Sequence, residues 1–434
     1  MAQHSPFLDR LRALALPVAL VATPALAQQP GINEDESRVP AYTLPDPLRL
    51  LDGSPVRNAA DWRERRRPEV LRSFEEHEYG KSPGPPSSVR YLVVEEDTHA
   101  LGGRAMRRQV RVLLEGKEDG AAFEILLYVP STATRPVPAF LGLNFNGNHS
   151  IHPDAGIRLA SSWLADGPGV VDHRATEAAR GSDAGSWPLE RILDRGYALA
   201  TVCYHDLEPD RPDAWKEGVR GHFGPGVRGP LGPSDWGAIG AWAWGLRRAL
   251  DYLETVPDVD AHRVAVIGHS RLGKTALWAG AQDERFAMVV SNDSGEGGAA
   301  LARRQFGETV EAITRVFPHW FAPRFRDYAG RESALPVDQH LLLALVAPRP
   351  LYVASATDDL WADPRGEFLA AKAAEPVYRL LRRGGLGVDD QPSPDRPVGD
   401  TIGYHLRHGP HALTAYDWEQ YLAFADRHLG PASP

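Results

Sequence analysis

The sequence lacks three features, and each absence excludes a class of protein. It has one cysteine, Cys203, so no disulfide can form within the chain and a disulfide-stapled scaffold is excluded. It has no excess of positive charge: 48 Lys and Arg against 57 Asp and Glu give a net charge of −9, which argues against nucleic acid as the main partner. After the N-terminal residues, it has no apolar run long enough to span a membrane.

The N terminus has the features of an export signal. Two arginines precede an apolar stretch, Ala13–Val21, and Ala25–Ala27 supplies the small residues that signal peptidases require. An anchoring helix is the alternative, but the stretch is too short to cross about 30 Å of hydrocarbon. We predict that residues 1–27 are a cleaved secretory signal peptide and that a bacterium exports the mature chain, from Gln28, to its periplasm or surroundings. A free thiol should be buried in that oxidising setting, and Cys203 lies in an apolar run.

The remaining residues, 28–434, predict one α/β catalytic domain. With 43% hydrophobic and 24% charged residues, the chain has the composition of a globular protein. Three strand-like runs with antiparallel spacing come first, and short buried strands then alternate with helices, as in a mostly parallel sheet covered on both faces. This order is that of an α/β-hydrolase, a three-layer αβα sandwich. Residues 31–86 precede it and are expected to wrap over the core. The expected strands are 91–95, 107–114, 122–129, 137–143, 197–204, 263–267, 288–291 and 351–355; the expected helices are 235–253 (Ser234 as N-cap), 271 onward, 337–345, 364–381 and 415–429.

Two long loops, 150–190 and 206–233, are rich in Gly, Pro, Asp, His and Trp. Loops longer than about 15 residues usually carry function. Both follow predicted parallel strands, so we expect them to cover the carboxyl edge of the sheet, where such folds place their sites.

The clearest chemical signal is Ser270, in the run VAVIGHSRLGK at 264–274. A β-branched strand runs into Gly-X-Ser and then a helix, which exposes a serine hydroxyl at a helix N terminus. The usual pattern has glycine two residues after the serine, whereas here Leu272 takes that place and Gly273 follows. The alternative is an ordinary strand-to-helix turn that happens to carry serine. We predict that Ser270 is a nucleophile.

A serine nucleophile needs a histidine base, which comes last in the chain order of this fold. Of the 16 histidines, His405, His408 and His411 cluster in what reads as a loop after the last strand. His411 is nearest the final helix, for which Thr414 and Asp417 predict a capping box, and it is the predicted base; His405 and His408 are the alternatives. The i, i+3, i+6 spacing of these histidines does not converge on a metal ion, so no metal or cofactor is expected.

Two carboxylates are candidates for the acid that orients the base. Asp359 follows the strand at 351–355, and Asp293 follows the strand at 288–291. Each can also be a loop-capping aspartate, a common role for Asp in turns. The residues alone leave the choice open.

Around these positions the sequence resembles carbohydrate esterase family 15, the glucuronoyl esterases of plant-biomass degraders. Gly268–Lys274 is close to the family's Gly-Cys-Ser-Arg-X-Gly-Lys, with histidine in place of cysteine. The resemblance covers roughly 137–429. Its further segments are Ser294–Gly298, Arg303-Arg304, Phe306–Glu308, Trp361–Pro364, Gly409–Trp418 and, more loosely, Leu143–His149.

The resemblance implies a serine esterase that cleaves the ester between glucuronic or 4-O-methylglucuronic acid on xylan and lignin alcohols. In that scheme Ser270 attacks the carbonyl and His411 moves the proton. Arg271 is suited to the developing oxyanion. Lys274, Glu308 and Trp361 match family positions that bind sugar hydroxyls. The alternatives are a solvated helix charge for Lys274, a surface carboxylate for Glu308 and a core side chain for Trp361.

The acid departs from the family pattern. Many members have Glu where this chain has Asp293, and others use an acid at the position of Asp359. Since Asp is one methylene shorter, we prefer Asp359 and keep Asp293 as an assisting or alternative acid.

Competing interpretations are an esterase of the same fold that acts on acetyl or feruloyl esters, and a non-catalytic carbohydrate-binding relative. A peptidase is the least favoured. We expect a monomer whose partner is the polysaccharide ester itself.

Overall fold

The computed structural model describes residues 32–133, 136–224 and 231–430. The predicted signal peptide, 1–27, lies outside them. From Asn33 onward the chain forms one compact unit. In the described residues, no helix has both the length and the apolar character needed to cross a membrane.

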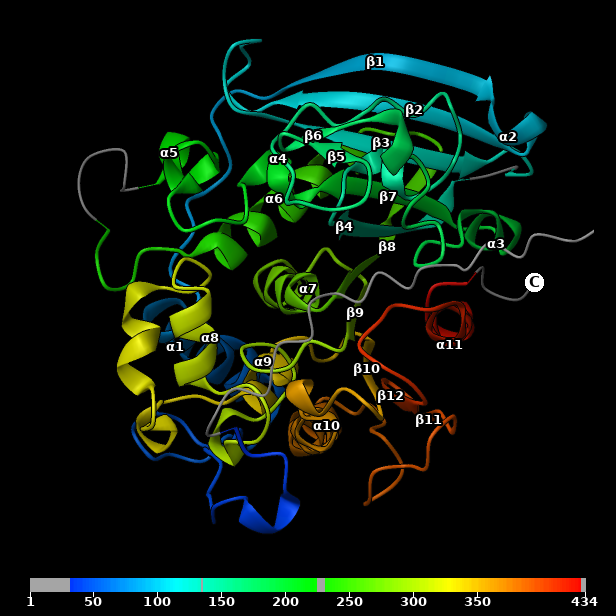
Figure 1. Cartoon of the computed structure of the whole chain (residues 1–434). Coiled ribbons are helices and arrows are strands. Elements are labelled where there is room, and N and C mark those ends of the chain that lie inside the picture. Colours follow the sequence, from blue (N-terminus) through cyan, green and yellow to red (C-terminus); the bar gives the residue numbers. More distant parts are fainter. Residues whose placement is uncertain (1–31, 134–135, 225–230, 431–434) are drawn as a thin grey trace, which may run out of the picture. The chain divides into compact units, whose positions relative to one another are not determined.

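A ten-stranded sheet forms the centre of this unit, in the order β1-β2-β3-β7-β4-β8-β9-β10-β12-β11 (Figure 1). The first three strands are antiparallel to each other, and β3 is antiparallel to β7. From β7 to β12 the neighbours are parallel, and β11 closes the edge antiparallel. The strands are β1 (Arg90–His99), β2 (Ala105–Leu113), β3 (Ala122–Pro130), β4 (Val137–Asn144), β7 (Ala198–Cys203), β8 (Val259–His269), β9 (Met288–Asn292), β10 (Leu351–Ala356), β11 (Val398–Gly399) and β12 (Ile402–Arg407). The predicted order of antiparallel before parallel strands is confirmed.

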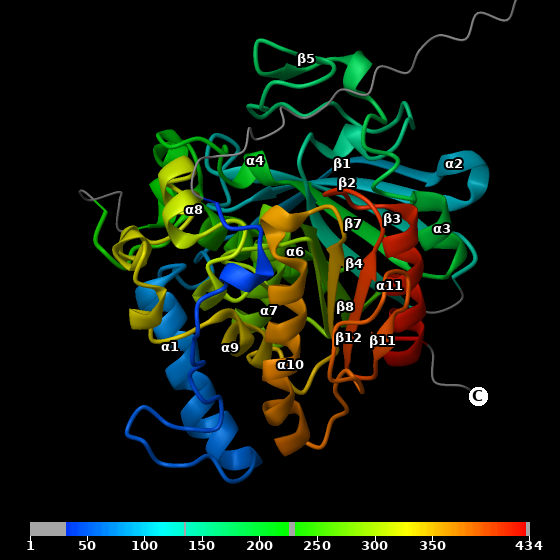
Figure 2. The ribbon, with the colours of Figure 1, turned by 60° about the horizontal axis from the view of Figure 1, so that its bottom comes forward.

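Helices cover both faces of the sheet, as Figure 2 shows nearly edge-on. One face carries α1 (Arg67–His77), α6 (Ala238–Leu253), α7 (Arg271–Gln282), α9 (Gln339–Ala344) and α10 (Pro364–Leu380). The other carries α3 (Leu189–Asp194) and α11 (Ala415–His428). The shorter elements are α2 (Ala100–Gly103), α4 (Tyr204–Leu207), α5 (Val219–Phe223), α8 (Val310–Val316) and a two-stranded sheet of β5 (Val170–Val171) and β6 (Arg174–Ala175). The fold is the predicted three-layer α/β-hydrolase.

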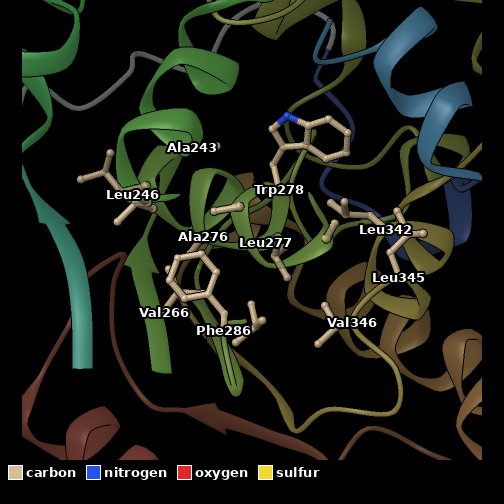
Figure 3. Close-up of a cluster of buried hydrophobic side chains, with 14 of the residues drawn as sticks. Ala243, Leu246, Val266, Ala276, Leu277, Trp278, Phe286, Leu342, Leu345 and Val346 are labelled. Carbon is tan, nitrogen blue, oxygen red and sulfur yellow. The ribbon is translucent and has the colours of Figure 1, made fainter. Parts of the chain in front are cut away.

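The core under the first face holds α7 in place (Figure 3). Leu277 and Trp278 of α7 are fully buried with Leu246 of α6 and Val266 of β8. Burying side chains of this size stabilises a fold by about 1.5–3 kcal/mol each. The helix that begins at the candidate nucleophile is therefore rigidly mounted on the sheet.

Two local predictions were wrong. Helix α6 begins at Ala238 with Gly237 as N-cap, not with Ser234, whose hydroxyl donates to the Glu76 carbonyl. Ser234 lies in a turn closed by the Asp235 N–H and the Gly232 carbonyl, and Asp235 then forms a β-bridge with Lys81. The stretch that contains the three clustered histidines was expected to be a loop after the last strand. Its first half, through Arg407, instead belongs to strand β12. By contrast, the capping box of α11 and the burial of the free cysteine are confirmed.

The first described residues wrap over the catalytic core. The Gly307 N–H donates to the Asn33 carbonyl at 2.8 Å, and Glu36 pairs with Arg304 at 2.6 Å. Farther along, Leu50 is buried in the main core. This wrap therefore holds the segment that leads into Glu308.

Candidate active site

Ser270 lies on a strained turn between β8 and α7. Its φ of 58° and ψ of −130° are rare for a non-glycine residue and are typical of nucleophile elbows. A Cβ at Gly268 would lie 1.8 Å from the Leu272 carbonyl oxygen, so the turn requires glycine there. The Ser270 N–H donates to the Asn292 carbonyl of β9, which fixes the turn to the next strand. The serine thus stands at the N terminus of α7, as predicted.

His411 and Asp359 come together beside this turn. His411 Nδ1 and Asp359 Oδ2 are 2.6 Å apart, and the carboxylate is 5% exposed. Their two loops are joined because the Asp358 N–H donates to the Gly409 carbonyl and the Gly409 N–H donates to Thr357 Oγ1. The structure therefore pairs the predicted base with the preferred acid.

The alternative histidines are engaged elsewhere. His405 is buried in β12, where Nε2 contacts Asp417 at 2.9 Å and Nδ1 contacts the Tyr352 hydroxyl. The side chain of His408 is 72% exposed and pairs with Asp395. The three histidines meet three different carboxylates, so they do not converge on one metal ion.

Asp293 lies behind this pair and is fully buried. Its Oδ2 accepts from Arg407 Nη2 at 3.0 Å and from the Ala412 N–H at 3.3 Å, while Oδ1 has no hydrogen-bond partner in the described structure. Burial, reinforced by the charge of Asp359, raises its pKa well above the ordinary range. Ligand atoms of Asp293, Asp359 and His411 lie within 4.8 Å of one another, so this group could hold a metal ion. Since Asp359 and His411 already share a short hydrogen bond, the geometry fits an acid–base pair with Asp293 behind it, held by Arg407.

Arg271 is fixed by a residue that the sequence did not single out. Its guanidinium donates to Asp210 and lies 4.8 Å from the Trp320 ring centroid. Asp210 also accepts from Trp320 Nε1 and contacts His319 Nε2. Although burial opposes it, these bonds and the charge of Arg271 hold the pKa of Asp210 well below its usual range. The only sequence signal for Asp210 was its place in the long loop 206–233.

A polar cluster on the α7 side consists of Lys274, Glu308 and Trp361. Lys274 Nζ donates to the Ser294 carbonyl at 2.5 Å and lies 3.6 Å from Glu308 Oε2. The Glu308 N–H donates to the Trp361 carbonyl at 2.8 Å. Burial lowers the pKa of Lys274 and raises that of Glu308, and each partner's charge opposes the shift. Lys274 is 4% and Glu308 6% exposed, so neither is a solvated surface charge, and Trp361 is half-buried.

Comparisons with known proteins agree with this geometry. A family model described as glucuronyl esterase of fungi matches residues 232–382. The carbohydrate esterase MZ0003, from an unknown prokaryotic organism, is 49% identical over 93% of both chains. The chain belongs to carbohydrate esterase family 15, the glucuronoyl esterases. It is therefore a carboxylic ester hydrolase, and the interpretation as a non-catalytic binding protein is wrong.

Solved structures of the same family are similar throughout. A glucuronoyl esterase from Solibacter usitatus is 48% identical and superimposes with a TM-score of 0.86 over 91% of this chain and all of its own. A promiscuous CE15 esterase from a marine bacterial metagenome is 49% identical, with a TM-score of 0.87 over 92% of this chain and all of its own. Compared by sequence alone, a 4-O-methyl-glucuronoyl methylesterase from Schizophyllum commune is 29% identical over 86% of this chain and 82% of its own.

His269 stands where the family motif that the sequence resembles has cysteine. Its Nδ1 lies 2.6 Å from Asn292 Oδ1, and its ring centroid is 4.5 Å from that of His411. Burial, reinforced by the charge of His411, lowers the pKa of His269 well below its usual range. In this esterase a neutral imidazole therefore packs directly against the candidate base.

Proposed function

We propose that the protein is a secreted serine esterase that hydrolyses the ester between (4-O-methyl-)glucuronic acid of glucuronoxylan and lignin alcohols. The observation that carries this proposal is the buried Lys274–Glu308 pair, whose lysine lies one helical turn after Ser270. An esterase for apolar esters has no use for a buried lysine and a buried carboxylate beside its nucleophile, because removing each charge from water costs free energy. A polyhydroxylated acyl group supplies hydroxyls that both can bind.

In the proposed reaction, Ser270 Oγ attacks the uronate carbonyl carbon while His411 Nε2 accepts its proton. The ester C–O bond then breaks, and His411 returns the proton to the departing alcohol, which leaves a glucuronoyl–serine ester. A water molecule, deprotonated by His411, hydrolyses this acyl-enzyme and restores Ser270. Asp359 stabilises the protonated imidazole in both halves of the reaction.

Arg271 is proposed to stabilise the oxyanion. Its backbone N–H lies in the first turn of α7, where N–H groups have no intrahelical partner. Its side chain, held by Asp210 and stacked on Trp320, places a fixed cation near the same turn. Donors fixed in advance stabilise developing charge without reorganisation.

The sugar is proposed to lie against Lys274, Glu308 and Trp361. Charged side chains form strong hydrogen bonds to hydroxyls, and the half-exposed indole suits the apolar face of a pyranose. We further propose that residues 1–27 direct export, to the periplasm or the medium, and that the enzyme acts as a monomer.

Hydrolysis of benzyl glucuronate by the purified protein tests the proposal, with a Ser270→Ala variant and an acetyl ester as controls. We expect the uronate ester to be cleaved far faster than the acetyl ester and the variant to be inactive. Faster cleavage of the acetyl ester would retain the nucleophile and reject the substrate class.

A broader ester range, including acetyl or feruloyl esters of plant polysaccharides, is the second candidate. It is favoured by the 49% identity to a structure described as that of a promiscuous esterase. The same assay separates the two, because a promiscuous enzyme cleaves both ester types at comparable rates.

A further inference from the structure

The hydrogen bond to Asp359 fixes only one nitrogen of the His411 ring. Nδ1 lies 2.6 Å from the carboxylate, whereas the side chain as a whole is 41% exposed. A single hydrogen bond at Nδ1 leaves the plane of the ring free to tilt. The proposed reaction needs the opposite nitrogen, Nε2, to face Ser270 in both halves of the cycle, so the plane of the ring must be held by a further contact.

His269 makes such a contact. Its ring centroid lies 4.5 Å from that of His411, and the two planes are inclined by 41°, within the range of aromatic pairs. His269 is the last residue of β8 and directly precedes Ser270. The ring that packs against the base and the hydroxyl that the base must reach therefore belong to consecutive residues of one rigid turn.

The ring of His269 is itself fixed by β9 and by the loop after β4. His269 and Asn292 are paired in register across β8 and β9, and His269 Nδ1 lies 2.6 Å from Asn292 Oδ1. Phe145 lies edge-on to the same ring, with centroids 6.2 Å apart and an interplanar angle of 83°. The Asn292 carbonyl accepts from the Ser270 N–H at 2.9 Å. Asn292 thus holds the nucleophile through its backbone and the His269 ring through its side chain.

The charge state of His269 suits a residue in contact with the base. Burial, reinforced by the charge of His411, lowers the pKa of His269 well below its usual range, so its imidazole stays neutral. A cationic neighbour would repel the imidazolium that His411 becomes during acyl transfer. A neutral ring packs against both forms of the base.

We infer that His269 is a positioning residue for the esterase reaction: its ring, held by Asn292, sets the plane of His411 so that Nε2 faces Ser270. The inference rests on the proposed serine–histidine mechanism and adds to it a residue that acts through the base.

Two substitutions at this position separate the ring from its hydrogen bond. His269→Ala removes both and should lower kcat by about 10- to 100-fold, because a misplacement of about 1 Å can cost about 10²-fold in rate. KM should stay close to that of the parent, since the residues proposed to bind the sugar are untouched. His269→Phe keeps a ring but also loses the bond to Asn292, and it should recover most of the lost kcat. A merely structural role of the hydrogen bond would not give this rescue.

Two neighbouring residues of β9 supply a second variant and its matched control. Asn292→Ala leaves His269 in place but frees its ring, and it should lower kcat less than His269→Ala does, again with little change in KM. Ser291→Ala changes the adjacent residue, which is equally buried and whose hydroxyl has no hydrogen-bond partner in the described structure. This control should keep the kcat of the parent. Thermal unfolding of each variant shows whether it is folded.

Either of two results would overturn the inference: a folded His269→Ala variant with the kcat of the parent, or a His269→Phe variant that loses as much kcat as His269→Ala. If His269→Ala does not fold, an unchanged kcat in Asn292→Ala overturns it instead. The proposed function fails separately, if Ser270→Ala stays active or the acetyl ester is preferred. Because every ester needs the base, the same kcat ratios can be measured on whichever ester the parent cleaves.

Discussion

Replacing each of the two buried carboxylates by asparagine separates their roles. Asp359→Asn keeps an oxygen that can accept from His411 but removes the negative charge beside the imidazolium formed during acyl transfer. Two unit charges about 4 Å apart at an effective dielectric of about 20 attract by about 4 kcal/mol, which is close to a thousandfold in rate. The His411 side chain is 41% exposed, so part of this attraction is screened. We expect kcat to fall about 10²- to 10³-fold with little change in KM.

Asp293→Asn should cost much less. Asp293 has no hydrogen bond to His411: its Oδ2 accepts from Arg407 and the Ala412 N–H, and burial together with the charge of Asp359 raises its pKa. Asparagine can still accept from Arg407 and from the Ala412 N–H. We expect kcat to fall less than about tenfold, since Asp359, the carboxylate that contacts His411, is kept.

Steady-state kinetics on benzyl glucuronate, with thermal unfolding of each variant as the folding control, measures both effects. A larger loss of kcat in Asp293→Asn than in Asp359→Asn would refute the assignment and make Asp293 the acid.

Three further changes probe the surroundings of the site. Lys274→Met should raise KM for the uronate ester and lower the melting temperature, because Glu308 loses its partner. Adding Glu308→Gln should restore the melting temperature but not KM. A restored KM would exclude a role of the pair in sugar binding. Arg407→Met removes the buried cation shared by Asp293 and Asp417 and should lower the free energy of unfolding in urea by about 3–5 kcal/mol, whereas a loss below about 1 kcal/mol would contradict this account. Burial raises the pKa of Glu78 from 4.5 to about 8, so the folded protein holds a proton that the unfolded chain releases, and stability should fall as the pH rises through this interval. Glu78→Gln, which mimics the protonated acid, should flatten that decline; an unchanged slope in urea unfolding between pH 5 and 8 would show that Glu78 does not cause it.

The parts of the site that depend on local chain geometry were predictable from the sequence. Ser270 stands out because a strand, a glycine turn and a helix are contiguous in the chain. His411 follows from the order in which this fold presents its base, whereas Asp359 was preferred over Asp293 only through the family resemblance. Lys274 was identified by its offset from the serine and by the family resemblance.

The groups that hold these side chains in place gave no local signal. Asp210 contacts Arg271 from 61 residues away, and Arg407 contacts Asp293 from 114 residues away. Such pairs are set by strand order rather than by neighbouring sequence. The same cause explains the wrong cap at Ser234, where a β-bridge from another part of the chain overrides a local capping preference.

The wrap at the start of the described chain supports the proposed sugar site. The Asn33 carbonyl and the Glu36 carboxylate are tied to Gly307 and Arg304, directly before Glu308. A mature enzyme that begins near Gln28 keeps both ties, whereas a recombinant chain that begins after Glu36 has neither. The first residues after the proposed cleavage site therefore brace the segment that carries Glu308.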